Sequence, residues 1–467
     1  MISGEKCVSR LWDRQSCEFE AKKSIFAEKT IFFRNFEVAV WNRRRILLFW
    51  RSMWKFLQGR LIFVRVVLLC SVAALVAIGI VAIYSVGHPA QSGPESGVGN
   101  LADLWKKQVL FAGIGCIGFL AVNLVNYRRV GAVSYWIYGA VLVLLGLLLA
   151  DKVVDLPFVP VVNNARRWIR IGTGTQFVQL QPSELCKLAY VLALAWFLRY
   201  RSNYRNFAVL TGPFALTLLA MVLIVLEPDL GTALLMMPVL FTMLFIAGAK
   251  VRHLLIIVLL ALLVSPALWH QMRPYQRTRI SSVLLQNSWV QEKAEQHPAL
   301  GSVLVGEQFT RKKWENNWGY HLIRSKYAAG SGGAKGYGFR HGPFIKYNFL
   351  PARQNDFIFA VIAHQWGFVG CLAVLGIYAV LLWCGLEIAG GNTDPFGRFL
   401  AVGIVAMFTF EIIVNVSMTL GLMPITGLTL PFVSYGGSSL VVGMTSVGLL
   451  NNVGRCRPFG VVRKPLQ

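Results

Sequence analysis

Residues 62–86 read IFVRVVLLCSVAALVAIGIVAIYSV, and this stretch decides the class of fold. Its one charged side chain is Arg65. A helix of about 20 apolar residues crosses a hydrocarbon core of about 30 Å, so the stretch is predicted to be a transmembrane helix. The composition agrees with this prediction, because only 14% of the 467 residues are charged, whereas soluble domains have roughly 25%.

Similar apolar runs recur along the chain and predict an all-α integral membrane protein with about ten transmembrane helices. The predicted helices lie at residues 62–86, 108–126, 130–150, 183–199, 207–226, 230–249, 252–269, 357–383, 399–422 and 436–453. They form a membrane domain over residues 61–455, with a large outer loop at 270–355 between the seventh and eighth helices.

The net charge of +25 is concentrated in clusters between the apolar runs. Lys and Arg accumulate in cytoplasmic loops of membrane proteins, and all the clusters fall on one side if both termini are cytoplasmic. The clusters lie at residues 43–60, 128–129, 199–205, 250–253 and 455–464. Nucleic-acid binding would also explain a strongly basic chain, but the sequence contains no motif for it, so membrane topology is the favoured interpretation.

Both ends of the chain, residues 1–60 and 456–467, are predicted to be basic cytoplasmic segments. Residues 43–45 are all arginine but precede only a short apolar stretch, so the first segment does not resemble a signal peptide. Two interpretations stay open for it: an interfacial amphipathic segment, or a stretch upstream of a true start at Met53.

The outer loop is basic, with 13 Lys and Arg residues against four Glu, a net charge of +9. Loops above about 60 residues are translocated regardless of charge, so topology does not explain this surplus. A polyanionic ligand such as a pyrophosphate head group would explain it, and so would anionic lipid of the outer leaflet. The glycine-rich stretch Gly330–Gly338 is interpreted as a phosphate-binding backbone or as a hinge.

The first of four unusual outer segments contains RRWIRIG at 166–172 and QPSELCK at 181–187. Pro182 is predicted to begin a helix, where its missing N–H costs nothing. Glu184 and Lys187 are three residues apart and therefore share a helix face. They are interpreted as a strut between helices or as the wall of a site.

Two further segments place carboxylates at helix ends. In the turn Glu227-Pro228-Asp229, Asp229 either caps the next helix or binds a cation or a sugar hydroxyl. In FLPARQNDFIFA at 349–360, Asp356 either caps the helix predicted at 357 or accepts a proton. Partial burial among the aromatic residues would raise the pKa of Asp356 toward a useful range for a base.

The fourth segment, GLMPITGLTLPFVSYGGSS at 421–439, is broken by Gly and Pro at membrane depth. Irregular backbone is tolerated there only when it is buried in protein or lines a wet cavity. Glu411 and Asn415, four residues apart in the preceding helix, add polar groups to one face.

Together the four segments resemble the SEDS family (shape, elongation, division and sporulation), whose members include RodA and FtsW, over about residues 60–455. The most specific match is PFVSYGGSS at 431–439. Other matches occur in the family's order at residues 167–169, 181–185, 228–232 and 356–360. The ten helices and the large loop before the eighth also match.

The resemblance implies a peptidoglycan glycosyltransferase in the bacterial cytoplasmic (inner) membrane. Such enzymes polymerise lipid II on the outer face of the membrane: the C4 hydroxyl of one disaccharide attacks the anomeric carbon of another, and polyprenyl pyrophosphate leaves. The resemblance also implies a partner, a class B penicillin-binding protein that supplies transpeptidase activity.

The family's essential carboxylate falls at Asp356, which is therefore the expected general base. Arg or Lys of the outer loop, or a divalent cation such as Mg²⁺ or Mn²⁺, would stabilise the leaving pyrophosphate. The expected substrate-binding residues are Arg167, Glu184, Lys187, Asp229, Lys346, Arg353 and Ser434.

The chain departs from the family pattern near Asp356. The family usually has Glu, His and Thr at the positions of Ala352, Gln354 and Asn355, and two acids at those of His364 and Gln365. These losses leave open a non-catalytic scaffold for a penicillin-binding protein. A flippase for a lipid-linked precursor is a third alternative, but no internal repeat of the kind common in transporters is visible.

Within the family, the sequence favours the RodA-like elongation branch. Pro274-Tyr275-Gln276 and Pro424-Ile425-Thr426-Gly427 resemble that branch. Leu428-Thr429-Leu430-Pro431 resembles the FtsW-like division branch, which stays the alternative.

Overall fold

The computed structural model describes residues 61–90, 101–151, 159–160, 167–171, 178–200, 204, 206–347, 349–350 and 352–456. All of them belong to one compact unit, Arg60–Gln467. The predicted N-terminal extension, and the C-terminal tail after Cys456, lie outside the described residues.

Helices occur at all ten positions that the apolar runs predicted. They are α2 (Ile62–Gly87), α3 (Leu104–Leu124), α4 (Tyr127–Ala132) with α5 (Ser134–Ala150), α6 (Pro182–Leu198), η2 (Phe207–Leu210) with α7 (Thr211–Leu226), α8 (Leu230–Ile246), α9 (Val251–Gln271), α16 (Ile358–Gly390), α17 (Pro395–Thr419) and α18 (Gly437–Arg455). Within the described residues, six helices are long and apolar enough to cross a membrane. The exact number of ten spans stays a prediction.

The helix boundaries differ from the apolar runs at some ends. Helix α3 begins at Leu104 rather than at residue 108, and α16 continues to Gly390 rather than ending at residue 383. Backbone hydrogen bonding can continue past the apolar part of a helix, so hydropathy alone does not locate these ends. Helix α16 also contains a kink at Gly367, whose φ of 63° is uncommon for residues with a Cβ atom.

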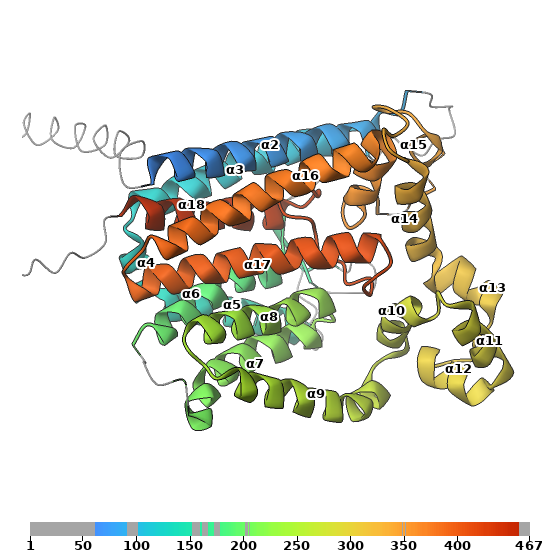
Figure 1. Ribbon diagram of the computed structural model, residues 1–467, viewed down its shortest axis with the longest axis horizontal. Coiled ribbons are helices and arrows are strands. Elements are labelled where there is room, and N and C mark those ends of the chain that lie inside the picture. Colours follow the sequence, from blue (N-terminus) through green and yellow to red (C-terminus); the bar gives the residue numbers. More distant parts are fainter. Residues whose placement is uncertain are drawn as a thin grey trace, which may run out of the picture. The chain divides into compact units, whose positions relative to one another are not determined.

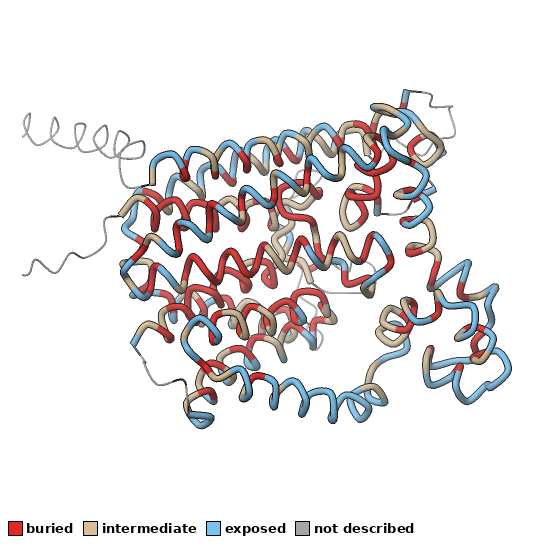
Figure 2. Tube along the Cα trace, in the orientation of Figure 1, coloured by how far each residue is buried: buried red, intermediate tan, exposed pale blue. Residues whose placement is uncertain are grey.

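The bundle is arranged around α17. Helix α16 packs between α2 and α17, α18 packs along α3, and α17 also contacts α6 and α8 (Figure 1). In the most apolar stretch of each helix, 67% of the residues of α17 are buried, against 6% of those of α9 (Figure 2). Helix α17 is therefore the central element, and α9 presents apolar side chains on nearly all sides, as a lipid-facing helix does.

The outer loop folds into a small helical subdomain at one end of the bundle (Figure 1). Its elements are α10 (Pro274–Leu284), α11 (Ser288–Gln296), α12 (Pro298–Val305), α13 (Arg311–Lys313), the π-helix η3 (Trp314–Trp318), α14 (Tyr320–Ser331) and α15 (Pro343–Lys346). A separate hydrophobic cluster holds its first part together and consists of Leu285, Ala294, Val305, Phe309 and Trp314.

Two hydrogen bonds attach this subdomain to the end of α17. Ser325 Oγ donates to the carbonyl of Thr419 at 2.9 Å, and Gln286 Nε2 donates to the carbonyl of Gly421 at 2.8 Å. Both acceptors are carbonyls just past or at the helix end, which have no partner within the helix. These bonds fix the subdomain to the last turn of α17, and α14 also packs against α16.

A short β-hairpin precedes α6. Strands β1 (Ile169–Ile171) and β2 (Val178–Leu180) are antiparallel, with Ile169 opposite Leu180. Strand β2 leads directly into Pro182, the first residue of α6, as the sequence predicted for that proline. The hairpin thus determines where α6 begins.

Candidate functional site

The structure brings the four unusual segments together. The first and second are joined because Arg167 Nε donates to the carbonyl of Glu227 at 3.0 Å. The third and fourth are joined because Ser434 Oγ donates to the carbonyl of Asn355 at 2.7 Å. These two pairs of segments are close enough to each other for the negative charge of Asp229 to raise the pKa of Asp356.

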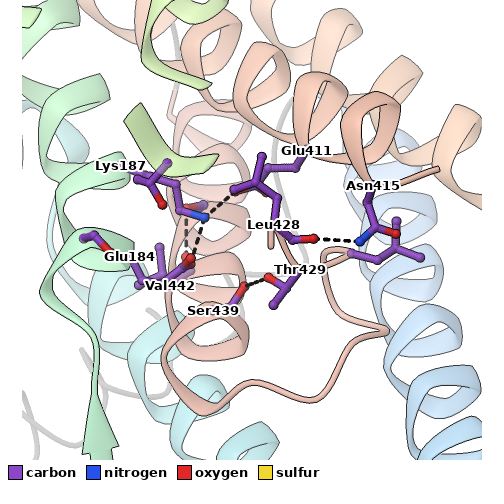
Figure 3. Close-up of polar contacts among 12 residues, drawn as sticks. Glu184, Lys187, Glu411, Asn415, Leu428, Thr429, Ser439 and Val442 are labelled. Atoms are coloured by element: carbon purple, nitrogen blue, oxygen red, sulfur yellow. Dashed lines mark hydrogen bonds and ion pairs between the residues drawn. The ribbon is translucent and has the colours of Figure 1, made fainter. Parts of the chain in front are cut away.

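The irregular part of the fourth segment, residues 420–436, is held by side chains from three helices. Each donates to a backbone carbonyl of the segment: Asn415 to Leu428 at 2.7 Å, Tyr378 to Pro431 at 2.5 Å, and Gln108 to Ser434 at 3.1 Å. Figure 3 shows the first of these contacts. Non-helical backbone at membrane depth requires such partners, so these side chains explain why the segment is stable without being a helix.

Asp356 lies just before α16 but does not cap it. The N-cap residue is Phe357, and no described side chain caps the helix, so the capping interpretation of Asp356 is wrong. Its carboxylate is half-buried and has no hydrogen bond or ion pair with a described residue. Burial raises the pKa of Asp356 to about 6, against a lowering effect of Arg279 and a further raising effect of Asp229. This combination provides a carboxylate that can accept a proton near neutral pH.

The sequence did not indicate that two residues of the outer loop, Arg279 and His321, lie near Asp356. Arg279 on α10 is the positive charge that Asp356 experiences, and it also acts on His321 of α14. The His321 ring stacks on Phe357, with centroids 6.3 Å apart. Burial, followed by the charge of Arg279, lowers the pKa of His321 and so favours its neutral imidazole. Only the folding of the outer loop over α16 brings these residues to the carboxylate.

A buried ionic cluster connects α6 with α17. Lys187 Nζ lies 2.8 Å from Glu184 Oε2 and 2.5 Å from Glu411 Oε1, and the three side chains are 4–8% exposed (Figure 3). The predicted helix face shared by Glu184 and Lys187 is confirmed, and so is their role as a strut between helices. A direct role of either residue in substrate binding stays a prediction.

Asp229 is the N-cap residue of α8, as the capping interpretation predicted. It accepts hydrogen bonds from the backbone of Thr232 at 3.4 Å, from Ser183 Oγ at 2.8 Å and from Gln181 Nε2 at 3.2 Å. Arg167 supports the same turn through the carbonyls of Glu227 and Pro228. Both residues thus stabilise this turn, and their contact with substrate stays a prediction.

The other predicted binding residues lie in different surroundings. Arg353 is 1% exposed, and its guanidinium donates to the carbonyls of Val86 and Ile345 at 3.2 and 3.1 Å. Lys346 lines a separate cavity of about 240 Å³. Ser434 contacts the backbone next to the carboxylate, because its hydroxyl donates to the carbonyl of Asn355, the residue before Asp356. Neither basic residue has a described contact with Asp356.

His364 and Gln365, which stand where the family usually has two acids, form hydrogen bonds with uncharged hydroxyl groups. The Nδ1 atom of His364 lies 2.8 Å from Ser331 Oγ, and Gln365 Nε2 donates to Ser85 Oγ at 2.6 Å. The glycine-rich stretch packs here against α16, since a Cβ atom on Gly332 would lie 1.9 Å from the carbonyl oxygen of Ala363. Close packing therefore accounts for Gly332, and the interpretations of the whole stretch as a phosphate-binding backbone or a hinge stay predictions.

These features define a class of protein: a multi-pass helical membrane protein with a buried ionic cluster and, at one end of its bundle, a carboxylate that has no partner among the described residues. Residues 65–457 match the model of the FtsW, RodA and SpoVE family of cell cycle proteins. The chain belongs to this family, which confirms the resemblance to the SEDS proteins.

Known relatives agree with this assignment. Stage V sporulation protein E of Bacillus subtilis is 36% identical over 75% of this chain and 86% of its own length. Peptidoglycan glycosyltransferase RodA of Treponema pallidum is 33% identical over 83% of this chain and 96% of its own. A chain from a structure that describes the coordination of polymerization and crosslinking by a peptidoglycan synthase complex is 31% identical, with a TM-score of 0.63 over 83% of this chain and 96% of that one.

Proposed function

We propose that this protein is a peptidoglycan glycosyltransferase that polymerises lipid II on the outer face of the cytoplasmic membrane. The observation that carries the proposal is the carboxylate of Asp356, which is half-buried, has no described partner and has a pKa raised to about 6. The name of the Treponema pallidum relative, a peptidoglycan glycosyltransferase, supports it. So does the match to a chain of a peptidoglycan synthase complex.

In this proposal Asp356 is the general base. Its carboxylate takes the proton of the C4 hydroxyl of one disaccharide while that oxygen bonds to the anomeric carbon of another. The bond from that carbon to the pyrophosphate breaks, and polyprenyl pyrophosphate leaves with the electron pair. A positioned base contributes about 10²- to 10⁴-fold to the rate, and a carboxyl group with a pKa near 6 is mostly ionised at pH 7.

The leaving pyrophosphate requires positive charge, and Arg279 is the cation whose charge acts on Asp356. Among the described residues, no three His, Cys, Asp or Glu side chains form a group able to hold a metal ion. A divalent cation such as Mg²⁺ therefore fits this site only if the substrate's pyrophosphate supplies most of the ligands, beside one carboxylate. When bound, it would neutralise charge on the pyrophosphate.

A class B penicillin-binding protein is the proposed partner, because the matched synthase complex combines polymerization with crosslinking. The elongation branch remains our favoured assignment, on the residues at 274–276 and 424–427. The relatives include RodA, FtsW and SpoVE proteins alike, so the division branch is the alternative.

The decisive variant is Asp356→Asn, which keeps the shape of the side chain but removes its basicity. Purified protein and lipid II, with and without a class B penicillin-binding protein, would be incubated and the glycan resolved on gels. We expect the variant to lose at least about 100-fold in polymerisation rate and to keep its thermal unfolding midpoint.

Asp103→Asn is the matched control, because the Asp103 carboxylate is 70% exposed and pairs with the exposed Lys106. Polymer from Asp356→Asn at the wild-type rate would refute the assignment of the base. If the wild-type protein binds its partner but makes no polymer, it is a scaffold. Transport of lipid II across vesicle membranes without polymer would indicate a flippase.

A further inference from the structure

A groove of about 520 Å³ lies in the helical subdomain of the outer loop, away from Asp356 in the sequence. Residues of α11, η3 and α14 line it, among them Gln291, Trp314, Asn316, Tyr320, Arg324 and Tyr327. We propose that this groove binds a saccharide chain that carries carboxylates. The inference rests on the proposed function, in which that chain is the glycan strand with its acidic peptide stems.

The side chains of the groove match the two kinds of surface on a sugar. A pyranose ring has C–H groups on its faces and hydroxyl groups around its edge. The rings of Tyr320 and Tyr327 offer apolar faces for the former, and the amides of Gln291 and Asn316 offer donors and acceptors for the latter. Tyr327 is 66% exposed, so its ring is open to a ligand.

Trp314 gives a second, independent indication of a ligand. Its side chain is 4% exposed, and its indole N–H is buried without a hydrogen-bond partner among the described residues. A buried donor of this kind is rare in native proteins and requires an explanation. It belongs to the π-helix η3, and such helices frequently occur at functional sites. A sugar hydroxyl in the groove would supply the missing acceptor.

The charges of the groove favour a carboxylate on the ligand. Arg311 pairs with Glu315 at 3.0 Å, and Lys326 donates to Gln286 at 2.7 Å. Arg324 has neither an ion pair nor a hydrogen bond with a described residue, and its guanidinium lies 5.0 Å from the ring centroid of Tyr320. An arginine positioned by stacking, with its N–H groups free, is suited to bind a carboxylate.

Helix α14 connects the groove with the candidate active site. Its residues Tyr320, Arg324 and Tyr327 line the groove, whereas His321 stacks on Phe357, next to Asp356. The hydrogen bonds of Ser325 and Gln286 fix this part of the loop to the end of α17. A strand that leaves Asp356 can therefore reach the groove across a single helix.

The test measures binding to the full-length protein in detergent, in the Asp356→Asn background so that no turnover occurs. One probe is an uncrosslinked tetrasaccharide fragment of peptidoglycan with its peptide stems, and the other is the neutral sugar chitotetraose. We expect Tyr327→Ala to weaken the binding of both probes about tenfold. We expect Arg324→Gln to weaken only the binding of the fragment that carries carboxylates.

Trp289→Ala is the matched control, because Trp289 is 64% exposed on α11 but does not line the groove. It should leave the dissociation constants of both probes unchanged. The proposal is overturned if Tyr327→Ala and Arg324→Gln bind both probes like the parent protein, or if the parent binds neither. It is also overturned if Tyr327→Ala loses a co-purifying penicillin-binding protein without any change in sugar binding, since the groove would then be a protein interface.

A second measurement separates the groove from the catalytic proposal. With lipid II as substrate, Tyr327→Ala should make shorter glycan strands than the wild-type protein, whereas Trp289→Ala should match the wild type in strand length and in the initial rate of coupling. Unchanged strand lengths in Tyr327→Ala would contradict glycan binding by the groove but leave the assignment as a polymerase intact. If the wild-type protein makes no polymer, the proposed function fails, and the binding data still decide whether the groove accepts a saccharide.

Discussion

At the scale of single residues, the chemistry depends on what surrounds one carboxylate. Asp356 is desolvated by burial, has no described partner and experiences one positive charge from Arg279. The sequence identified Asp356 from its position beside aromatic residues at a helix start and from the family pattern. It did not identify Arg279, because only the tertiary fold of the outer loop brings α10 near the start of α16.

The raised pKa of Asp356 predicts the pH dependence of polymerisation. The active form of a base is the ionised one, which is lost as the pH falls through about 6. We expect kcat/KM to fall about tenfold per pH unit below that value. Arg279→Gln removes a charge that lowers the pKa of Asp356, so it should move this acid limb to higher pH.

The measurement is the initial rate of polymerisation between pH 4.5 and 8. Lys335→Gln is the control, since Lys335 is an exposed cation of the same outer loop and should leave the acid limb in place. An acid limb that stays unchanged in Arg279→Gln would mean that another group is responsible for it.

At the scale of helices, the buried ionic cluster determines how α6 and α17 pack. The spacing of Glu184 and Lys187 predicted their shared face, because that relation is local to one helix. The third member, Glu411, could be recognised only as a polar residue in an apolar run. Its pairing with Lys187 depends on the packing of two helices that are distant in sequence, which no local pattern encodes.

Removal of the central cation should therefore be costly. Lys187→Met leaves Glu184 and Glu411 buried without their counter-charge, and breaking such a cluster typically costs about 3–5 kcal/mol. We expect a clearly lower thermal unfolding midpoint in detergent, with part of the loss recovered by adding Glu411→Gln. Lys106→Met should change the midpoint little, because the Lys106 and Asp103 side chains are 64% and 70% exposed. Equal midpoints for both variants would contradict a structural role of the cluster.

Short elements were the least predictable from the sequence. The apolar runs located the ends of the bundle helices to within about four residues, except the end of α16, since each run is long and continuous. The helices of the outer loop are short and polar, and they are organised by the small cluster around Phe309 and Trp314. The hairpin of β1 and β2 has three residues per strand, too few for a recognisable alternation.

At the scale of the whole molecule, the positive clusters predict its orientation. Arg129 belongs to a cluster placed in the cytoplasm, whereas Ala299 lies in the outer loop, and both residues are exposed. In an active cysteine-free variant, Ala299→Cys should react with a membrane-impermeant maleimide in intact cells. Arg129→Cys should react only after the membrane is opened. The reverse pattern would invert the topology and place Asp356 on the cytoplasmic side.

The hydrogen bonds that hold residues 420–436 determine when this segment can fold during synthesis of the chain. The side chains that satisfy its carbonyls come from α3, near the start of the bundle, and from α16 and α17, which directly precede the segment, so the first partner is made long before the others. The segment cannot obtain all its partners until nearly the whole chain has been made and assembled. The neighbourhood of Asp356 is accordingly among the last parts of the protein to mature, and a partly synthesised chain cannot contain a complete active centre.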